Sequence, residues 1–151
     1  MQGDSTGARV QLDKALAIWR EIGDRWAIAN TLTGLGDVSG EERDFDTSRA
    51  YFGESLAINR EIGDRLALAY LFEALGCLAA DQGDPERAMR LVGVASALRA
   101  VIGAPLPPAE ASRLEDRLAP ARALLSDEVV QAAEAAGLTL SLDEAIELAI
   151  G

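Results

Sequence analysis

A repeat of 40 residues constrains the fold of this chain more than any other feature of its sequence. Residues 15–25 and 55–65 form two blocks of eleven positions, of which nine are identical. A third, more divergent copy occupies residues 95–104, so that an Ile-Gly pair recurs at 22–23, 62–63 and 102–103. A fixed period of this length is typical of repeat architectures, in which each unit packs mainly against its neighbours. The sequence therefore predicts an array of similar units.

Each repeat is predicted to contain two helices. Mostly apolar residues recur at a spacing of three or four, as in Phe52, Ser55, Ile58 and Ile62, which is the pattern of a helix with one buried side. The corresponding stripe of the first copy consists of Ala8, Leu12, Ala15, Ile18 (or Trp19) and Ile22. The other helix of each unit carries apolar residues such as Leu32, Leu35, Leu71 and Leu75.

Glycine and aspartate mark the ends of these helices. A glycine follows the last stripe position in every copy, at Gly23, Gly63 and Gly103, where a left-handed helix end favours a residue without Cβ. Asp24 and Asp64 come next and can cap the following helix, while Asp84 before Pro85 indicates another helix start. We therefore expect an all-α fold, an alpha-alpha superhelix in which antiparallel helix pairs stack as a solenoid.

The repeats are predicted to span residues 1–104, and residues 105–151 to form a C-terminal helical cap. Residues 5–22 are interpreted as a second helix whose own first helix is absent. Because a solenoid helix packs against both its partner and its neighbour, this end should expose apolar surface. We expect the chain to be a fragment of a longer protein, or another chain to cover this helix.

Prolines separate the third copy from the tail. Those at residues 105–108 remove backbone donors and disfavour helix before them. Pro108 can instead occupy the first turn of a helix that carries Leu114 and Leu118. Pro120 lies inside this pattern and is expected to kink or split the helix.

The last 26 residues are acidic and are predicted to contain two short helices. Ser126 is a candidate cap for a helix that ends at Gly137, and Ser141 with Glu144 forms a capping-box pattern for the last helix. Residues 126–151 hold six acidic residues and no basic one, against 19 acidic and 14 basic residues before them. We interpret this asymmetry as the polar outer face of the cap.

Composition excludes most catalytic chemistry. The chain has no His and one Cys, and its single lysine, Lys14, belongs to no phosphate-binding loop. Adjacent carboxylates occur, but mostly where a solvated turn or helix start explains them. The sequence therefore predicts a protein without enzymatic activity, cofactor or metal. A net charge of −11 disfavours nucleic-acid and membrane partners, and the lack of a leader or long apolar run predicts a cytoplasmic location.

At the repeat positions the sequence resembles the tetratricopeptide repeat family. Leu35-Gly36 and Leu75-Gly76 match the Leu-Gly pair of the first helix, and Gly83-Asp84 matches the turn to the second. Small residues such as Ala88 and Ala95 match the interlocking positions. The period departs from the family's 34 residues, and its first-helix Trp and Tyr are missing.

The Ile-Gly-Asp-Arg junctions at residues 22–25 and 62–65 resemble longer-period variants of the repeat. Such variants occur in the C-terminal sensor arrays of large bacterial signalling ATPases and LuxR-type transcriptional regulators.

The resemblance implies a binding surface, because the first helices of such arrays line a concave face that takes peptides or helices. Transferred by offset from each Leu-Gly pair, this face comprises Asn30, Thr33, Asp37, Tyr70, Glu73, Cys77 and Asp81. Plain solvent exposure, or contact with the C-terminal tail, is the competing interpretation of these positions. Their acidic character would favour a neutral or basic partner segment. Cys77 itself is expected to be a buried or groove-lining small residue, since no base accompanies it.

The function predicted from the sequence is therefore protein binding without catalysis. The preferred interpretation is the C-terminal part of a sensor or scaffold region in a bacterial signal-transduction or transcriptional regulator. Its partner would be another protein, a peptide, or other domains of the same parent chain. The alternative is a free-standing adaptor, or a homodimer formed through the N-terminal helix.

Overall fold

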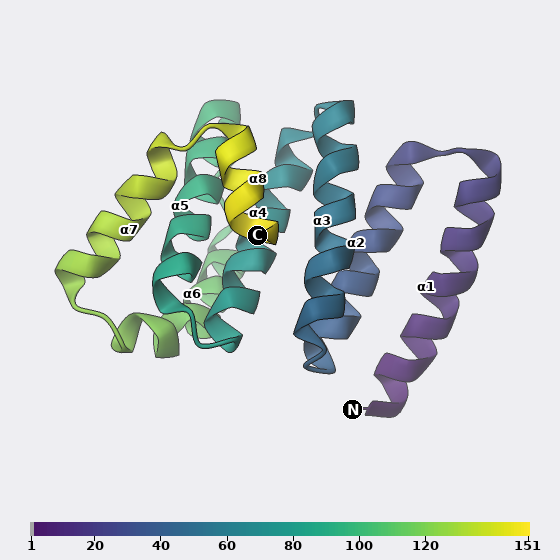
Figure 1. Cartoon of the computed structure of the whole chain (residues 1–151), viewed down its shortest axis with the longest axis horizontal. Helices are drawn as coiled ribbons and strands as arrows, with labels where there is room; N and C mark the ends of the chain where they lie inside the picture. The colour runs from purple at the N-terminus through teal and green to yellow at the C-terminus, as the bar shows by residue number, and fades with distance from the viewer. Residues whose placement is uncertain (1) are drawn as a thin grey trace. The chain divides into compact units, whose positions relative to one another are not determined.

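The computed structural model describes the backbone of residues 2–151 and the side chains from residue 5 onward, and every regular element in this part is an α-helix (Figure 1). One compact unit ends at Asp64 and contains α1 (Gln2–Ile22), α2 (Arg25–Glu41) and α3 (Phe45–Ile62). The second unit, Arg65–Gly151, contains α4 (Arg65–Asp81), α5 (Pro85–Ile102), α6 (Pro108–Ala123), α7 (Asp127–Thr139) and α8 (Leu142–Ile150). The predicted all-α helical-repeat fold class is confirmed.

The helices end and begin at the glycines and aspartates that the sequence indicated. Gly23, Gly63 and Gly103 have φ angles of 80°, 82° and 65°, a left-handed conformation that glycine adopts without strain. Asp24 accepts a hydrogen bond from the backbone N–H of Ala27 at 3.0 Å, and Asp84 caps α5 in the same way. The turns of the two hairpins α2–α3 and α4–α5 are at Arg43-Asp44 and Gly83-Asp84, where Arg43 and Gly83 have φ angles of 62° and 79°.

The two hairpins pack through equivalent residues. In the first unit Gly36 of α2 lies against the ring of Phe52 in α3, where a Cβ would approach the ring to 2.5 Å. The hydroxyl of Ser48 in α3 donates to the carbonyl of Gly36 at 2.7 Å. In the second unit Gly76 of α4 lies against Val92 of α5, and each residue follows its counterpart by 40 positions. The glycine of the Leu-Gly pair thus admits the facing helix in both copies.

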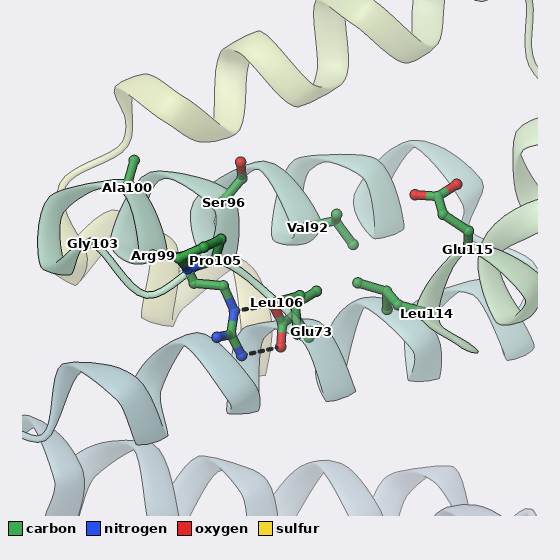
Figure 2. A pocket seen from close by; sticks show the side chains of 10 residues that line it. All are labelled: Glu73, Val92, Ser96, Arg99, Ala100, Gly103, Pro105, Leu106, Leu114 and Glu115. Atoms are coloured by element: carbon green, nitrogen blue, oxygen red, sulfur yellow. Dashed lines mark hydrogen bonds and ion pairs between the residues drawn. The ribbon is translucent and has the colours of Figure 1, made fainter. Parts of the chain in front are cut away.

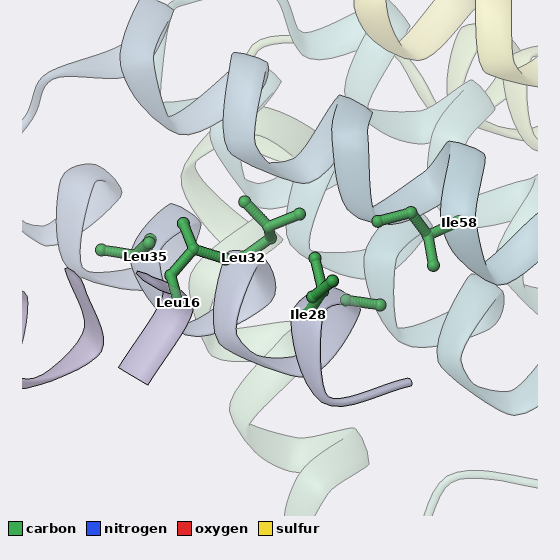
Figure 3. Packing of buried hydrophobic residues seen from close by; sticks show 6 residues of the cluster. Leu16, Ile28, Leu32, Leu35 and Ile58 are labelled. Atoms are coloured by element: carbon green, nitrogen blue, oxygen red, sulfur yellow. The ribbon is translucent and has the colours of Figure 1, made fainter. Parts of the chain in front are cut away.

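The core of the first unit lies along α2, as Figure 3 shows. It consists of Leu16, Ile28, Ala29, Leu32, Leu35 and Ile58, with Leu12, Trp19 and Tyr51 packed at its edge. The stripe predicted for α1 was right in part, because Trp19 rather than Ile18 packs on this cluster. Ile18 and Ile22 are 53% and 65% exposed, so this end of the repeats exposes apolar surface.

The tail helices also begin where they were predicted to begin. Pro108 opens α6, Ser126 caps α7 through the N–H of Val129 at 3.2 Å, and Ser141 and Glu144 form both hydrogen bonds of a capping box. The prediction that Pro120 would split its helix was wrong. Pro120 lies in the last turn of α6, where only one backbone hydrogen bond is lost before the helix ends.

The sequence predicted that α7 ends at Gly137, but α7 continues to Thr139. Gly137 instead determines how closely α7 packs on α5. A Cβ at Gly137 would overlap the carbonyl oxygen of Arg90, and a Cβ at Gly93 would overlap that of Glu134. The two helices therefore touch backbone to backbone through a pair of glycines. At the other end of α5, Arg87 donates to the carbonyl of Ala149 at 3.0 Å and holds α8 in place.

Candidate functional site

The residues predicted for partner binding on α2 differ in their surroundings. Asn30 is exposed and Asp37 is half-buried. Thr33 is directed at α3, because its hydroxyl lies 2.7 Å from the Ser55 hydroxyl and donates to the carbonyl of Ala29 at 3.0 Å. Thr33 therefore contributes to the α2–α3 hairpin.

The remaining predicted residues lie on α4 and define what we call the α4 face: Tyr70, Glu73, Cys77 and Asp81. Their spacing of three or four places them along one side of the helix. Tyr70 is 45% exposed, whereas Glu73 and Cys77 are only 7% and 4% exposed. The structure thus brings these four residues together on one helix but gives them different environments.

The carboxylate of Glu73 is held by Arg99 of α5. The Nε and Nη2 atoms of Arg99 donate to the two carboxylate oxygens at 2.6 and 2.9 Å, and both side chains are about nine-tenths buried. The hydrogen bonds to Glu73 raise the pKa of Arg99. A third donor, Nη1, reaches the carbonyl of Ala104 at 3.1 Å and fixes the start of the linker after α5. Bidentate geometry of this kind orders both side chains.

A helix of the tail reaches the C-terminal end of the α4 face. Arg117 of α6 donates to the carboxylate of Asp81 at 3.1 Å. Burial raises the pKa of the Cys77 thiol, and the nearby charge of Arg117 partly opposes this effect. Contact with the tail, the competing interpretation of these positions, is therefore observed at Asp81. Cys77 is buried, as expected, and its raised pKa makes it a poor nucleophile.

A cavity of about 410 Å³ opens beside Glu73, between α4, α5, α6 and the linker (Figure 2). Its lining combines apolar side chains with the Glu73–Arg99 ion pair. The lining residues are Glu73, Val92, Ser96, Arg99, Ala100, Gly103, Pro105, Leu106, Leu114 and Glu115. A concave, largely apolar site with few oriented polar groups suits an apolar side chain or small molecule.

Among the side chains that the structure describes, no three of His, Cys, Asp or Glu lie together as metal ligands would. Within the same residues no helix is both long and apolar enough to cross a membrane. The one buried carboxylate of the α4 face is already neutralised by Arg99.

Sequence reasoning missed Arg99, Arg117 and the apolar lining of the cavity. Arg99 left a signal, because the 40-residue shift places it where the first unit has Asn59, while Glu73 replaces Thr33. This paired replacement indicates that the two positions face each other. The Arg117–Asp81 contact left no comparable signal, since it depends on how α6 folds back onto α4.

Comparison with known proteins finds one similarity, and it lies over the repeats. Residues 27–100 match the model of the tetratricopeptide repeat family, which is just under half of the 151-residue chain. Searches of curated proteins and of solved structures gave no match. Tetratricopeptide repeats generally mediate protein–protein interactions. The matched segment runs from α2 into the last turn of α5, so the two hairpins α2–α3 and α4–α5 are the tetratricopeptide-like part of this protein.

Proposed function

We propose that the chain is a non-catalytic protein-interaction module, and that the α4 face and its cavity hold a segment of a protein partner. The cavity beside Glu73 carries this proposal, because its apolar walls leave room for a side chain from outside. The tetratricopeptide match of the helices that build it supports protein binding as the general activity. Glu115 at the cavity already pairs with Arg122 at 3.2 Å, so the apolar lining rather than this carboxylate would hold the partner.

The proposal extends to the kind of protein that contains this module. We infer that the module belongs to the C-terminal sensor or scaffold region of a bacterial signal-transduction or transcriptional regulator and works in the cytoplasm. Its partner would be another protein or other domains of the parent chain, with neither nucleic acid nor membrane as a ligand. The net charge of −11 supports this choice of partner class, because nucleic acids and anionic membranes require basic surface.

Selection of peptides tests the binding site. A random peptide library displayed on phage would be selected against the full chain, and the enriched peptides measured against two variants. Leu106→Trp enlarges a side chain that lines the cavity from the linker (Figure 2), whereas Ala132→Trp adds a Trp side chain at an exposed position of α7. We expect the enriched peptides to lose binding to the Leu106 variant alone. Equal binding to both variants would show that the cavity is not the site.

A homodimer through α1 is the second candidate. Val10, Ile18 and Ile22 expose large apolar side chains on this helix. Ile58, which occupies the position of Ile18 one repeat later, is only 6% exposed within the core of α2 and α3. The comparison suggests that α1 has an apolar side suited to a further helix, and a second copy of α1 would supply one. Sedimentation at several concentrations would detect the dimer.

A further inference from the structure

α6 lies on part of the α4 face and occupies it with its own side chains. Its Arg117 pairs with Asp81 at 3.1 Å, Leu114 lines the cavity beside Glu73, and Leu118 is fully buried. These three residues of α6 are spaced i, i+3 and i+4, so they form one side of the helix. The chain thus presents a helix of its own to the surface that the proposed function assigns to a partner.

The attachment of α6 depends on few buried residues. Only Leu118 and Ala121 are buried among its 16 residues. Pro107 precedes the helix and provides no side-chain cap, and Pro120 removes a backbone donor from its last turn. The Arg117–Asp81 pair is exposed by 57% and 34%, so solvent screens most of its attraction. A segment with few buried apolar contacts opens at low free energy.

The two ends of α6 are tied to other elements, which limits how it can move. Arg122 in the last turn donates to Glu134 of α7 at 2.6 Å. At the other end, Arg99 holds the carbonyl of Ala104, and the proline-containing linker leads from there to Pro108. The part of α6 that touches the α4 face lies between these two ties, so it can detach while its ends remain in place.

We propose that α6 is a built-in competitor, which covers the α4 face until a partner helix of the same chemistry replaces it. This inference rests on the proposed function and specifies its ligand. The partner would present a leucine, then an arginine and a second leucine three and four residues later, as Leu114, Arg117 and Leu118 do in α6. The arginine would take over the carboxylate of Asp81, and the leucines would take the places of Leu114 and Leu118. Because α6 is tethered, it competes at a high effective concentration and sets the affinity that a partner must exceed.

The only cysteine of the chain, buried Cys77, reports whether α6 uncovers the α4 face. In the full chain, the rate of Cys77 labelling by a thiol reagent would be measured for Arg117→Glu, which replaces attraction to Asp81 by repulsion. We expect labelling about fivefold faster, the change that corresponds to loss of one surface ion pair. The substitution also removes the charge that lowers the pKa of Cys77, so electrostatics alone would slow the reaction. Faster labelling therefore means greater exposure.

Two further variants distinguish loss of the Arg117–Asp81 ion pair from a general effect of the charge change on α6. Arg113→Glu makes the same charge change at an exposed residue of α6 and should label at the wild-type rate. The pair Asp81→Arg and Arg117→Glu restores attraction with reversed signs and should restore protection. An Arg117→Glu chain that keeps wild-type helicity by circular dichroism and labels at the wild-type rate would overturn the proposal. Equal acceleration by Arg113→Glu would overturn it as well.

A labelled peptide of residues 108–125 tests replacement directly. Fluorescence anisotropy should show tighter binding of this peptide to the Arg117→Glu chain than to the wild type, because its competitor is weakened. Equal affinities would contradict the competitor role. If phage-selected peptides bind at the cavity but Cys77 stays equally protected, the proposed function stands and this inference fails. If Cys77 becomes exposed but no peptide binds, the proposed function fails.

Discussion

The guanidinium of Arg99 forms two hydrogen bonds to the carboxylate of Glu73, at 2.6 and 2.9 Å, across the α4–α5 hairpin. In the other hairpin the corresponding positions are Asn59 and Thr33, both linked to the hydroxyl of Ser55. The two copies thus satisfy the same interior position in two ways, by a buried ion pair and by a neutral hydrogen-bond network. In each hairpin these polar groups find their hydrogen-bond partners within that hairpin.

Removal of one partner of the ion pair should destabilise the second unit. We expect Arg99→Asn or Glu73→Thr alone to lower the free energy of unfolding by about 3 kcal/mol, because a charge is left buried without a partner. The double variant copies the polar residues of the first hairpin and should lose less than the sum of the two. Urea denaturation measures these values. Arg20→Ala removes an exposed arginine 3.5 Å from Glu54 and should change stability by less than about 0.5 kcal/mol.

A methyl group at the α5–α7 contact should also be destabilising. Gly137→Ala places a Cβ on the carbonyl oxygen of Arg90, and the backbone cannot rotate away from it as a side chain could. We expect a loss of about 1–3 kcal/mol, as in other overpacked interiors. Gly7→Ala is the matched control, since no atom lies within 4 Å of its Cβ and the residue lies inside α1. This substitution should stabilise by about 0.5–1 kcal/mol. Similar thermal midpoints for both variants would contradict the packing role of Gly137.

The capping box of α8 should lower the pKa of Glu144 measurably. Hydrogen bonds from the backbone and the side chain of Ser141 lower the pKa of Glu144. A folded-state pKa below the unfolded value means that ionised Glu144 favours the folded state above the unfolded pKa. This contribution disappears as the pH falls through the folded pKa. An NMR titration should show the pKa of Glu144 rising in Ser141→Ala, because the side-chain hydrogen bond is lost while the backbone N–H of residue 141 remains. An unchanged Glu144 pKa would show that the Ser141 side chain contributes nothing to the shift.

A charge on the outer side of α1 tests the homodimer. Ile18→Glu alters a side chain that is 53% exposed, so it should leave the free energy of unfolding within about 0.5 kcal/mol of the wild-type value. If α1 forms the interface, sedimentation equilibrium should show a concentration-dependent mass for the wild type and a monomer for the variant. Leu16→Glu is the contrasting change, because Leu16 is only 6% exposed in the core and should unfold the first unit. A wild-type chain that remains monomeric would exclude the dimer.

Local chemistry made much of the fold predictable. Glycine at a left-handed position and aspartate before a helix act within one turn, so Gly63, Asp24 and Asp84 could be interpreted without knowledge of their neighbours. The same local reasoning was wrong at Gly137, since a glycine that ends a helix and one that admits a second backbone look alike in sequence. The sequence also could not show whether Ile18 or Trp19 packs against α2, because both lie near the same side of α1.

The candidate site was predictable in position but not in partners. The repeat offset placed Glu73, Cys77 and Asp81 on one side of α4, because helical periodicity alone decides this. Which charges they meet depends on Arg99 from the next helix and on Arg117 from a helix 36 residues after Asp81. Contacts between distant segments follow from how helices pack, and a single sequence does not encode them in a local pattern.

The unlike polar pairs inside the two hairpins have a consequence for folding fidelity. Neighbouring repeats that share their length, their helix order and their Leu-Gly pair are at risk of exchanging helices as they fold. A hairpin of α2 with α5 would enclose Arg99 opposite Thr33 without a carboxylate, and one of α4 with α3 would enclose Glu73 without a base. The correct pairing is therefore marked by charge. The buried arginine and glutamate thus distinguish the α4–α5 hairpin from the α2–α3 hairpin.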